Sequence, residues 1–307
     1  MSTTDLSRDG VRSARGTAMR ILFALCAFLS ILTTVAIVLT LLLDAVDFFA
    51  AVSPLEFLTG TKWSPTNEPV AFGVLPLISG TLIVTFGSAA IALPIGLLTA
   101  IYLSEYASDR RRAYLKPALE VLASVPTVIY GYFALVYVTP VLDTFLPLST
   151  FNALSASIMV GIMIIPMVSS ISEDAMSAVP DSLRQASYGL GATKFTVSTS
   201  VVVPAALSGI FSSFILALSR AIGETMIVAI AAGQTPRMVD LTDPAGLFLD
   251  SIQTMTAAMV QIGASDVVGQ STAYKGLFAV GLTLFVITFA MNLVSEWVAS
   301  RYREVYR

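Results

Sequence analysis

The sequence predicts an all-α polytopic membrane protein with six transmembrane helices, and three observations carry this prediction. First, 56% of its 307 residues are hydrophobic and 12% are charged, with a mean hydropathy of +0.83. Soluble domains typically contain about 25% charged residues. Second, six apolar runs are each long enough for a helix that crosses a bilayer, which needs roughly 20 residues. Third, lysine and arginine gather in alternate loops between those runs.

The residue types that are missing from the chain exclude several kinds of functional site. The chain has no histidine and a single cysteine, Cys26, which lies inside the first apolar run. Imidazole metal ligation, histidine-based catalysis and a disulfide framework are therefore excluded. We expect no cofactor, no metal site and no nucleic-acid partner.

The first apolar run, 21–43, follows a polar N-terminal tail at 1–20. At about 23 residues the run is too long for the hydrophobic core of a signal peptide, and it lacks a clear small-residue cleavage site. We therefore expect a retained first transmembrane helix, followed by an external loop at 44–74.

Residues 75–300 are predicted to form the transmembrane core, with a short C-terminal tail at 301–307. The five spans of this core are predicted at 75–103, 118–138, 154–171, 205–232 and 276–299. A polar segment at 172–204 separates the third of these spans from the fourth. A long external loop at 233–273 precedes the last span.

Two features complicate the simple count of spans. Pro94, Pro126 and Pro166 fall within apolar runs, where prolines are tolerated if neighbours satisfy the freed carbonyls, and kinks are the simplest interpretation. The stretch 245–264 is moderately apolar, but Asp250 and two glutamines interrupt it. We interpret it as an external helix that lies against the protein or the membrane surface.

Lysine and arginine predict the side of the membrane on which each loop lies. Thirteen of the 17 fall in the two tails, the loop after the second span and the 172–204 segment. The opposite loops contain only Lys62, Arg237 and Lys275. Because cytoplasmic loops carry the excess of positive charge, we expect both termini to be cytoplasmic.

An intramembrane charge pair marks the middle of the 205–232 run. Arg220 and Glu224 lie there, although one charged residue at a bilayer centre costs roughly 2.5–3.5 kcal/mol on insertion scales. Four residues apart on a helix, the two side chains would share one side and neutralise each other. The small and polar residues of this run gather on one half of a helical wheel: Ser208, Gly209, Ser212, Ser213, Ala217, Ser219, Arg220, Gly223 and Glu224.

Two interpretations of this pair are open. In the first, it is a structural ion pair that fixes helix packing. In the second, Arg220 contacts a transported anion, because its permanent charge and fork of donors suit the oxygens of an anion, and Glu224 holds the guanidinium when no anion is bound. Ser213, Ser219 and Thr225 are candidate hydroxyl donors, of which Thr225 is the weaker because it lies off the polar arc.

The 172–204 segment carries a second candidate site. Pro180 and Asp181 are helix-start signals, and Gly191 allows one short helix to end and to turn tightly into another. An amphipathic loop on the membrane surface is the alternative interpretation. We expect Pro204 to lead straight into the 205–232 span.

The spacing in this segment resembles the loop of ABC-importer permeases that reads Glu-Ala-Ala, three residues, Gly, nine residues, Ile-x-Leu-Pro. The corresponding residues here are Gln185, Ala186, Ser187, Gly191, Val201, Val203 and Pro204. Gln185 replaces the acidic residue, but its size and helix propensity are similar. In that family the loop forms coupling helices that sit in a groove of the ATPase. The resemblance implies this coupling role for Gln185, Ala186, Ser187, Gly191, Ala192 and Pro204.

Three further stretches resemble the permeases of phosphate ABC importers. They are Phe72-Gly-Val-Leu-Pro-Leu-Ile-Ser-Gly-Thr-Leu82, Val125-Pro-Thr-Val-Ile-Tyr-Gly131 and Ser219-Arg-Ala-Ile-Gly-Glu-Thr-Met226. The loops at 59–65 and 254–257 are more similar to the PstC-type subunit than to its PstA-type partner. The resemblance extends from about residue 20 to the end of the chain.

This resemblance implies the type I ABC importer permease architecture and ATP-driven import of inorganic phosphate across the bacterial plasma (inner) membrane by alternating access. The implied partners are a second, PstA-type permease, two cytoplasmic ATPase subunits, an external phosphate-binding protein and membrane lipid. The chain has no Gly-x-x-x-x-Gly-Lys-[Ser/Thr], so we expect a non-catalytic subunit. Two alternatives are a permease for another oxyanion (sulfate, molybdate or phosphonate) and an ATP-independent secondary anion transporter.

Overall fold

The computed structural model describes residues 6–239 and 242–301, and helices dominate this part of the chain. Four described helices are long and apolar enough to cross a membrane, and the number rises to six if each of two bent helix pairs counts as one span. The four long helices are α1 (Leu6–Ala51), α3 (Leu75–Ile101), α7 (Ala153–Ser177) and α15 (Thr272–Arg301). The predicted all-α membrane fold is confirmed. The predicted C-terminal tail lies outside the described residues, except Arg301.

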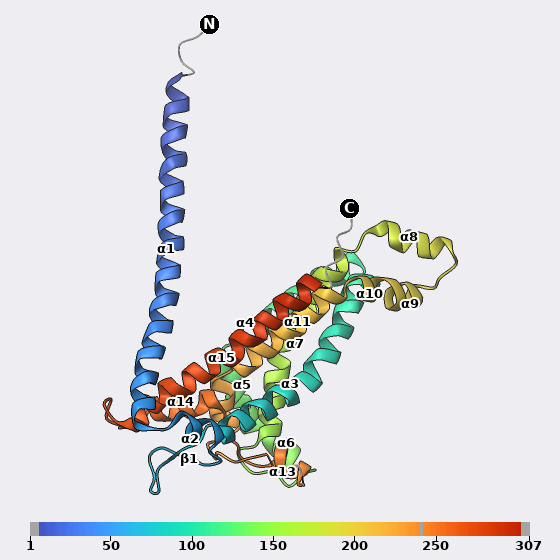
Figure 1. The fold of residues 1–307 in the computed structure, drawn as a ribbon. Coiled ribbons are helices and arrows are strands. Elements are labelled where there is room, and N and C mark those ends of the chain that lie inside the picture. The colour runs from blue at the N-terminus through green and yellow to red at the C-terminus, as the bar shows by residue number, and fades with distance from the viewer. Residues whose placement is uncertain (1–5, 240–241, 302–307) are drawn as a thin grey trace.

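The first helix diverges from the bundle in its N-terminal part (Figure 1), whereas its C-terminal part packs against α15. It continues through Ala51, beyond the predicted end at residue 43, because the residues that follow include no helix breaker before Pro54. Its final turns bury Phe48 against Phe57 of α2 (Pro54–Thr59) and Phe72 in edge-to-face contacts. A short hairpin of β1 (Trp63–Ser64) and β2 (Ala71–Phe72) completes this cluster.

Two of the predicted spans are formed by bent helix pairs rather than by single helices. The pair formed by α4 (Asp109–Ser124) with α5 (Thr127–Phe133), η2 (Ala134–Val138) and α6 (Thr139–Asp143) bends by 84°. The bend lies at Val125 and Pro126, which both have extended backbone, because proline lacks an amide donor and disfavours helical geometry in the residue before it.

The second bend interrupts the predicted straight entry into the 205–232 span. Helices α9 (Lys194–Val197), η3 (Ser198–Val202) and α10 (Val203–Ala205) meet α11 (Leu207–Ile222) at 71°. The prediction that Pro204 leads straight into this span is therefore wrong. The π-helical turn η3 and the missing amide of Pro204 weaken the hydrogen-bond ladder just before the bend.

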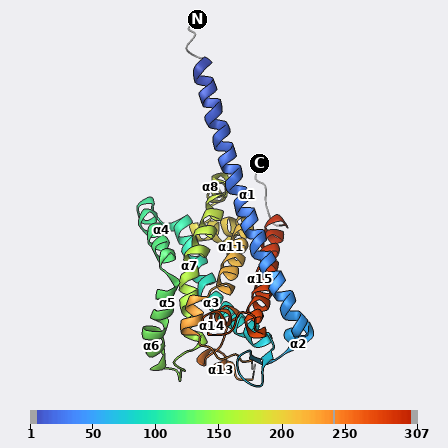
Figure 2. The same cartoon turned by 90° about the vertical axis from the view of Figure 1, so that its left-hand side faces the viewer.

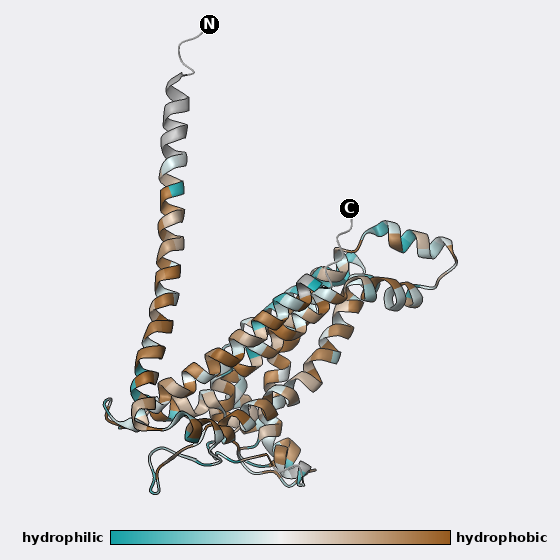
Figure 3. Cartoon of the chain, in the orientation of Figure 1, coloured by the Kyte–Doolittle hydropathy of each residue, from teal (hydrophilic) through white to brown (hydrophobic). Residues whose placement is uncertain are grey.

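The two ends of the bundle differ in character. Helix α8 (Asp181–Gly189) projects at one end, and α13 (Pro244–Leu249) lies at the other (Figure 1). We call these the α8 end and the α13 end. Apolar residues cover α1 and much of the bundle between the ends, and hydrophilic ones gather near the α8 end (Figure 3). This distribution agrees with a membrane-embedded body.

The centre of the bundle consists of α3, α7 and α11, with α4 to α6 on one flank and α1 and α15 on the other (Figure 2). Helices α7 and α11 approach closely at Gly209, where a Cβ atom would lie 2.3 Å from the Cβ of Ala175. Any larger residue at 209 would therefore push these two helices apart. Helix α3 ends in a π-helical turn, η1 (Tyr102–Tyr106).

The predicted external helix at 245–264 is two short helices, α13 and α14 (Met255–Gly263). Of the two predicted locations, against the protein or on the membrane surface, α14 occupies the first, because Met255 and Ile262 are buried. The amide of Met255 donates to Thr81 Oγ1 at 3.0 Å. Asp250, the residue that follows α13, forms an ion pair with Arg237 at 2.9 Å.

Candidate functional site

The intramembrane pair forms an ion pair, but not on one continuous helix. Arg220 is in the last turn of α11, and Glu224 lies in the break before α12 (Met226–Ala231). Arg220 Nη1 is 3.1 Å from Glu224 Oε2. The other carboxylate oxygen accepts the backbone amides of Met226 at 3.0 Å and Ile227 at 3.3 Å. Glu224 therefore also caps α12, and this role explains why the predicted continuous helix is interrupted here.

The two partners differ in burial. The Glu224 side chain is 2% exposed, whereas that of Arg220 is 44% exposed. The backbone carbonyl of Glu224 also accepts a hydrogen bond from Thr256 of α14 at 2.7 Å. When the guanidinium turns away, Glu224 keeps the two amide hydrogen bonds to Oε1 and the Thr256 bond to its backbone carbonyl.

Arg220 lines a cavity of about 340 Å³ between α4 and α7. Arg220 Nη2 lies 3.8 Å from Met163 Sδ on the cavity wall. The apolar part of the wall consists of Leu103, Leu119, Ala123, Met163, Ile164, Pro166 and Met167. The charged side chains that line it are Lys116, Glu120, Glu173 and Arg220. A charge in such an apolar cavity interacts more strongly than it would in water.

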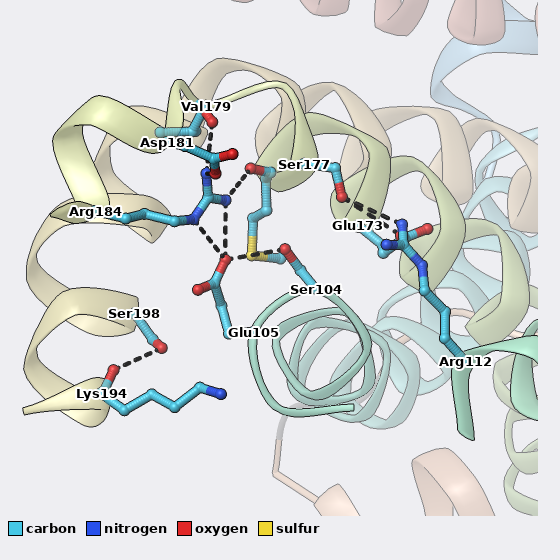
Figure 4. Close-up of polar contacts among 11 residues, drawn as sticks. Ser104, Glu105, Arg112, Glu173, Ser177, Val179, Asp181, Arg184, Lys194 and Ser198 are labelled. Atoms are coloured by element: carbon cyan, nitrogen blue, oxygen red, sulfur yellow. Dashed lines mark hydrogen bonds and ion pairs between the residues drawn. The ribbon is translucent and has the colours of Figure 1, made fainter. Parts of the chain in front are cut away.

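A second cluster of charged residues forms the cavity wall near the C-terminal end of α7. Glu173 is fully buried and pairs with Arg112 and with Lys116, whose Nζ lies 2.9 Å from Glu173 Oε2. Figure 4 shows Arg112 reaching Glu173 from α4. Lys116 also contacts the exposed Asp174 at 3.3 Å. The cluster joins α4 to α7 on the α8 side of the 84° bend.

The three candidate hydroxyls are not brought to this cavity. Ser213 is buried and contacts Ser172 of α7 at 2.8 Å. Ser219 donates to Asn292 of α15 at 3.4 Å, and Thr225 donates to the carbonyl of Gly223 at 3.2 Å. The buried face of α11 does not coincide with the predicted polar half of the helix. It includes Ile210, Ser213, Ala217 and Ala221.

The 172–204 segment forms the predicted pair of short helices, although α7 extends to Ser177 and delays its start. Helix α8 begins at Asp181, directly after Pro180, as predicted. Gly191 has φ +82°, and the amides of Gly191 and Ala192 donate to the carbonyls of Tyr188 and Ser187, at 2.9 and 3.1 Å. This is a Schellman motif, which requires the left-handed geometry that glycine adopts without strain.

The residues named for coupling differ in their surroundings. Gln185 and Ala186 are exposed on α8, and Ser187 and Ala192 are half-buried. Pro204 is exposed beside the 71° bend.

Sequence reasoning missed the long-range polar contacts of this segment, including those of Glu173 and of Arg184. Arg184 of α8 bonds to Glu105 of η1, which lies 79 residues earlier in the chain (Figure 4). No local spacing links two residues this far apart, so no sequence signal identifies the contact.

Comparison with known proteins identifies the family. Residues 92–304 match the family described as "Binding-protein-dependent transport system inner membrane component". The probable ABC transporter permease YqgH of Bacillus subtilis (strain 168) is 35% identical over 286 residues, covering 92% of this chain and 90% of that protein. The phosphate transport system permease PstC of Mesorhizobium japonicum (strain LMG 29417 / CECT 9101 / MAFF 303099) is 32% identical over 331 aligned residues, covering 98% of each.

The fold agrees with this assignment. A solved bacterial alginate ABC transporter, in complex with an alginate pentasaccharide-bound periplasmic protein, contains a similar chain with a TM-score of 0.61 and 15% identity. The match covers 97% of this chain and 96% of that one. The chain therefore belongs to the family of binding-protein-dependent ABC transporter permeases, the non-catalytic membrane subunits of ABC importers.

Proposed function

We propose that this permease subunit imports inorganic phosphate and that Arg220 is its anion contact. The observation that carries the proposal is the half-exposed guanidinium at a cavity whose walls are largely apolar. Phosphate carries between one and two negative charges near neutral pH. Arg220 supplies a permanent positive charge and donors that fit two phosphate oxygens.

The ion pair suits reversible binding. An anion that enters the cavity replaces the Glu224 carboxylate at the guanidinium. Glu224 keeps its hydrogen bonds to the amides of Met226 and Ile227, so its charge stays partly satisfied at the start of α12. When the anion leaves, the 3.1 Å contact forms again. The hydroxyls of Ser213, Ser219 and Thr225 would join the site only if α11 moves.

The name of one relative supports phosphate as the proposed substrate. The PstC relative is named for phosphate transport, whereas YqgH carries no substrate in its name. We extend the phosphate assignment to this chain because the Arg220 site suits an oxyanion. The partners that follow are a PstA-type permease, two ATPase subunits and an external phosphate-binding protein.

Energy enters, in this proposal, at the α8 end, which we place in the cytoplasm. The exposed residues Gln185 and Ala186 would contact the ATPase, and Gly191 shapes the turn behind them. Because a 71° bend separates α10 from α11, movement of α8 would reach the transmembrane helices through side-chain packing rather than along one continuous helix. Leu183 and Ala192 pack in one cluster with residues of α3, α7 and α11, among them Ala100, Met176 and Ile210.

Uptake of radiolabelled phosphate by the reconstituted complex tests this function. We expect ATP-dependent uptake that vanadate inhibits and that excess unlabelled phosphate, but not sulfate, competes. Effective competition by sulfate would assign the permease to another oxyanion. Uptake driven by a proton or sodium gradient without ATP would contradict the ABC mechanism.

A further inference from the structure

Arg184 points into the protein, although it lies on the projecting helix α8. Its side chain is 15% exposed, whereas the neighbouring Gln185 is exposed. Figure 4 shows the guanidinium directed toward the ends of other helices. Nε and Nη2 donate to Glu105 Oε1 at 3.3 and 3.0 Å, and Nη2 also donates to the carbonyl of Met176 at 2.9 Å. Nη1 donates to the carbonyl of Val179 at 2.5 Å and to Asp181 at 3.2 Å.

These bonds join three elements. Met176 lies in the last turn of α7, whose final carbonyls have no partner within the helix and carry the negative end of its dipole. Glu105 lies on η1 at the end of α3, and its side chain is 5% exposed. Charge-assisted hydrogen bonds between a guanidinium and a buried carboxylate are among the stronger polar contacts in proteins. Arg184 therefore fastens α8 to the ends of both α3 and α7.

Tyr106, the residue after Glu105 on η1, contacts the second short helix, α9. Lys194 of α9 lies with Nζ 5.2 Å from the centroid of the Tyr106 ring, within the range of a cation–π interaction. Glu105 and Tyr106 thus contact α8 and α9, respectively. A π-helical turn presents the two side chains, and such turns are frequent at functional sites.

The two anchoring elements also form cavity walls. Leu103, two residues before Glu105 on η1, lines the cavity that contains Arg220. Helix α7 contributes the wall from Met163 to Glu173. A displacement of α8 that acts through Arg184 would therefore reach the cavity from two sides, without passing through the bend before α11.

We propose that Arg184 and Glu105 are positioning residues that transmit movement of α8 to α3 and α7. This inference rests on the proposed role of α8 as the ATPase contact. It differs from a direct contact between Arg184 and the ATPase, because the guanidinium is already occupied within this chain. Asp181, which is 84% exposed, contributes little to the anchor.

The test measures the response of the cavity to ATP without any transported substrate. Cys26 is replaced by serine, and Thr127→Cys introduces a thiol at the cavity wall. The assembled complex with the second permease and the ATPase is labelled with a maleimide, with and without ATP and vanadate. The variants are Arg184→Gln and Glu105→Gln, and the matched control is Arg110→Gln, which changes an exposed arginine of α4.

We expect ATP with vanadate to change the labelling rate in the parent and in the Arg110→Gln control. In Arg184→Gln and Glu105→Gln the rate should stay at its value without nucleotide, while the ATPase still co-purifies and hydrolyses ATP. An undiminished response in an assembled Arg184→Gln complex would overturn the inference. Loss of the ATPase from Arg184→Gln, but not from Glu105→Gln, would instead make Arg184 a direct contact.

Three further outcomes are also decisive. If Arg184→Gln does not accumulate in the membrane, Glu105→Gln decides by the same criteria, because it removes only the carboxylate side of the anchor. If the parent complex shows no response to ATP, the proposed coupling role of α8 fails and the inference falls with it. If the parent responds to ATP with vanadate and both variants respond to the same extent, the inference alone is rejected.

Discussion

At the scale of single residues, the site depends on an asymmetry between Arg220 and Glu224. The carboxylate is buried and held by the amides of α12, and the guanidinium is half-exposed in a cavity. The sequence predicts the pair, because two charges in an apolar run are costly unless they are paired or used. It does not reveal the capping role of Glu224, because four-residue spacing also fits one continuous helix.

The two roles of Glu224 are separable. In Glu224→Gln the amide oxygen still accepts the bonds from Met226 and Ile227, whereas Glu224→Ala removes them. We expect Glu224→Ala to be less stable than Glu224→Gln by about 0.5–2 kcal/mol, the usual effect of losing a helix cap. Thermal unfolding of the two detergent-solubilised variants checks this difference. Equal melting temperatures would contradict the capping role.

At the scale of elements, the sequence predicts turns well and bends poorly. The short helix that begins at Asp181 and the turn at Gly191 follow from local signals, and the structure confirms them. From the sequence we expect a kink at Pro126 and a straight entry at Pro204, but proline alone does not determine whether a helix continues, kinks slightly or turns by 84° or 71°. The packing of neighbouring helices decides this, and it is not encoded in a local pattern.

The Schellman turn predicts that alanine substitutions at Gly191 and Gly189 change the stability of this segment in opposite directions. Gly191 has φ +82° with open space around it, so Gly191→Ala meets no clash but places an alanine in left-handed geometry, at a cost of about 1–2 kcal/mol. Gly189 is helical and equally unobstructed, so Gly189→Ala should stabilise α8 by up to about 1 kcal/mol. Limited trypsin cleavage after Lys194 measures local opening of the segment.

Cleavage should be faster in Gly191→Ala, by roughly 5–30-fold if it follows the population of the open form, and no faster in Gly189→Ala. A bulky residue at 191 should also lower uptake more than ATP hydrolysis. Equal cleavage of both alanine variants would argue against the left-handed turn as the feature that shapes this segment.

At the scale of the whole molecule, hydropathy and charge predict the membrane fold, whereas the cavity and the contact between Arg184 and Glu105 require the structure. Both depend on which helix ends meet, and residues 79 positions apart share no sequence pattern. Large apolar side chains are exposed on α1 and on the flank formed by α4 to α6. These faces suit lipid and a second permease subunit, in agreement with the proposed assembly.

The orientation of the subunit is testable with single cysteines. In a Cys26→Ser background, Thr66→Cys in the hairpin loop should react with a membrane-impermeant maleimide in intact cells. Leu190→Cys, at a position that is 90% exposed at the α8 end, should react only after permeabilisation. This result follows from the excess of positive charge at that end. The reverse pattern would place α8 outside and remove its proposed contact with the ATPase.

The most direct test of the central claim is phosphate uptake by Arg220→Gln in the assembled complex, with Arg110→Gln as the matched control. Loss of the charged partner of a desolvated anion costs about 2–5 kcal/mol, so we predict that uptake falls roughly 30-fold or more while assembly and ATP hydrolysis persist. The control should transport phosphate like the parent. Normal uptake by Arg220→Gln would contradict the account and leave the pair with a structural role alone.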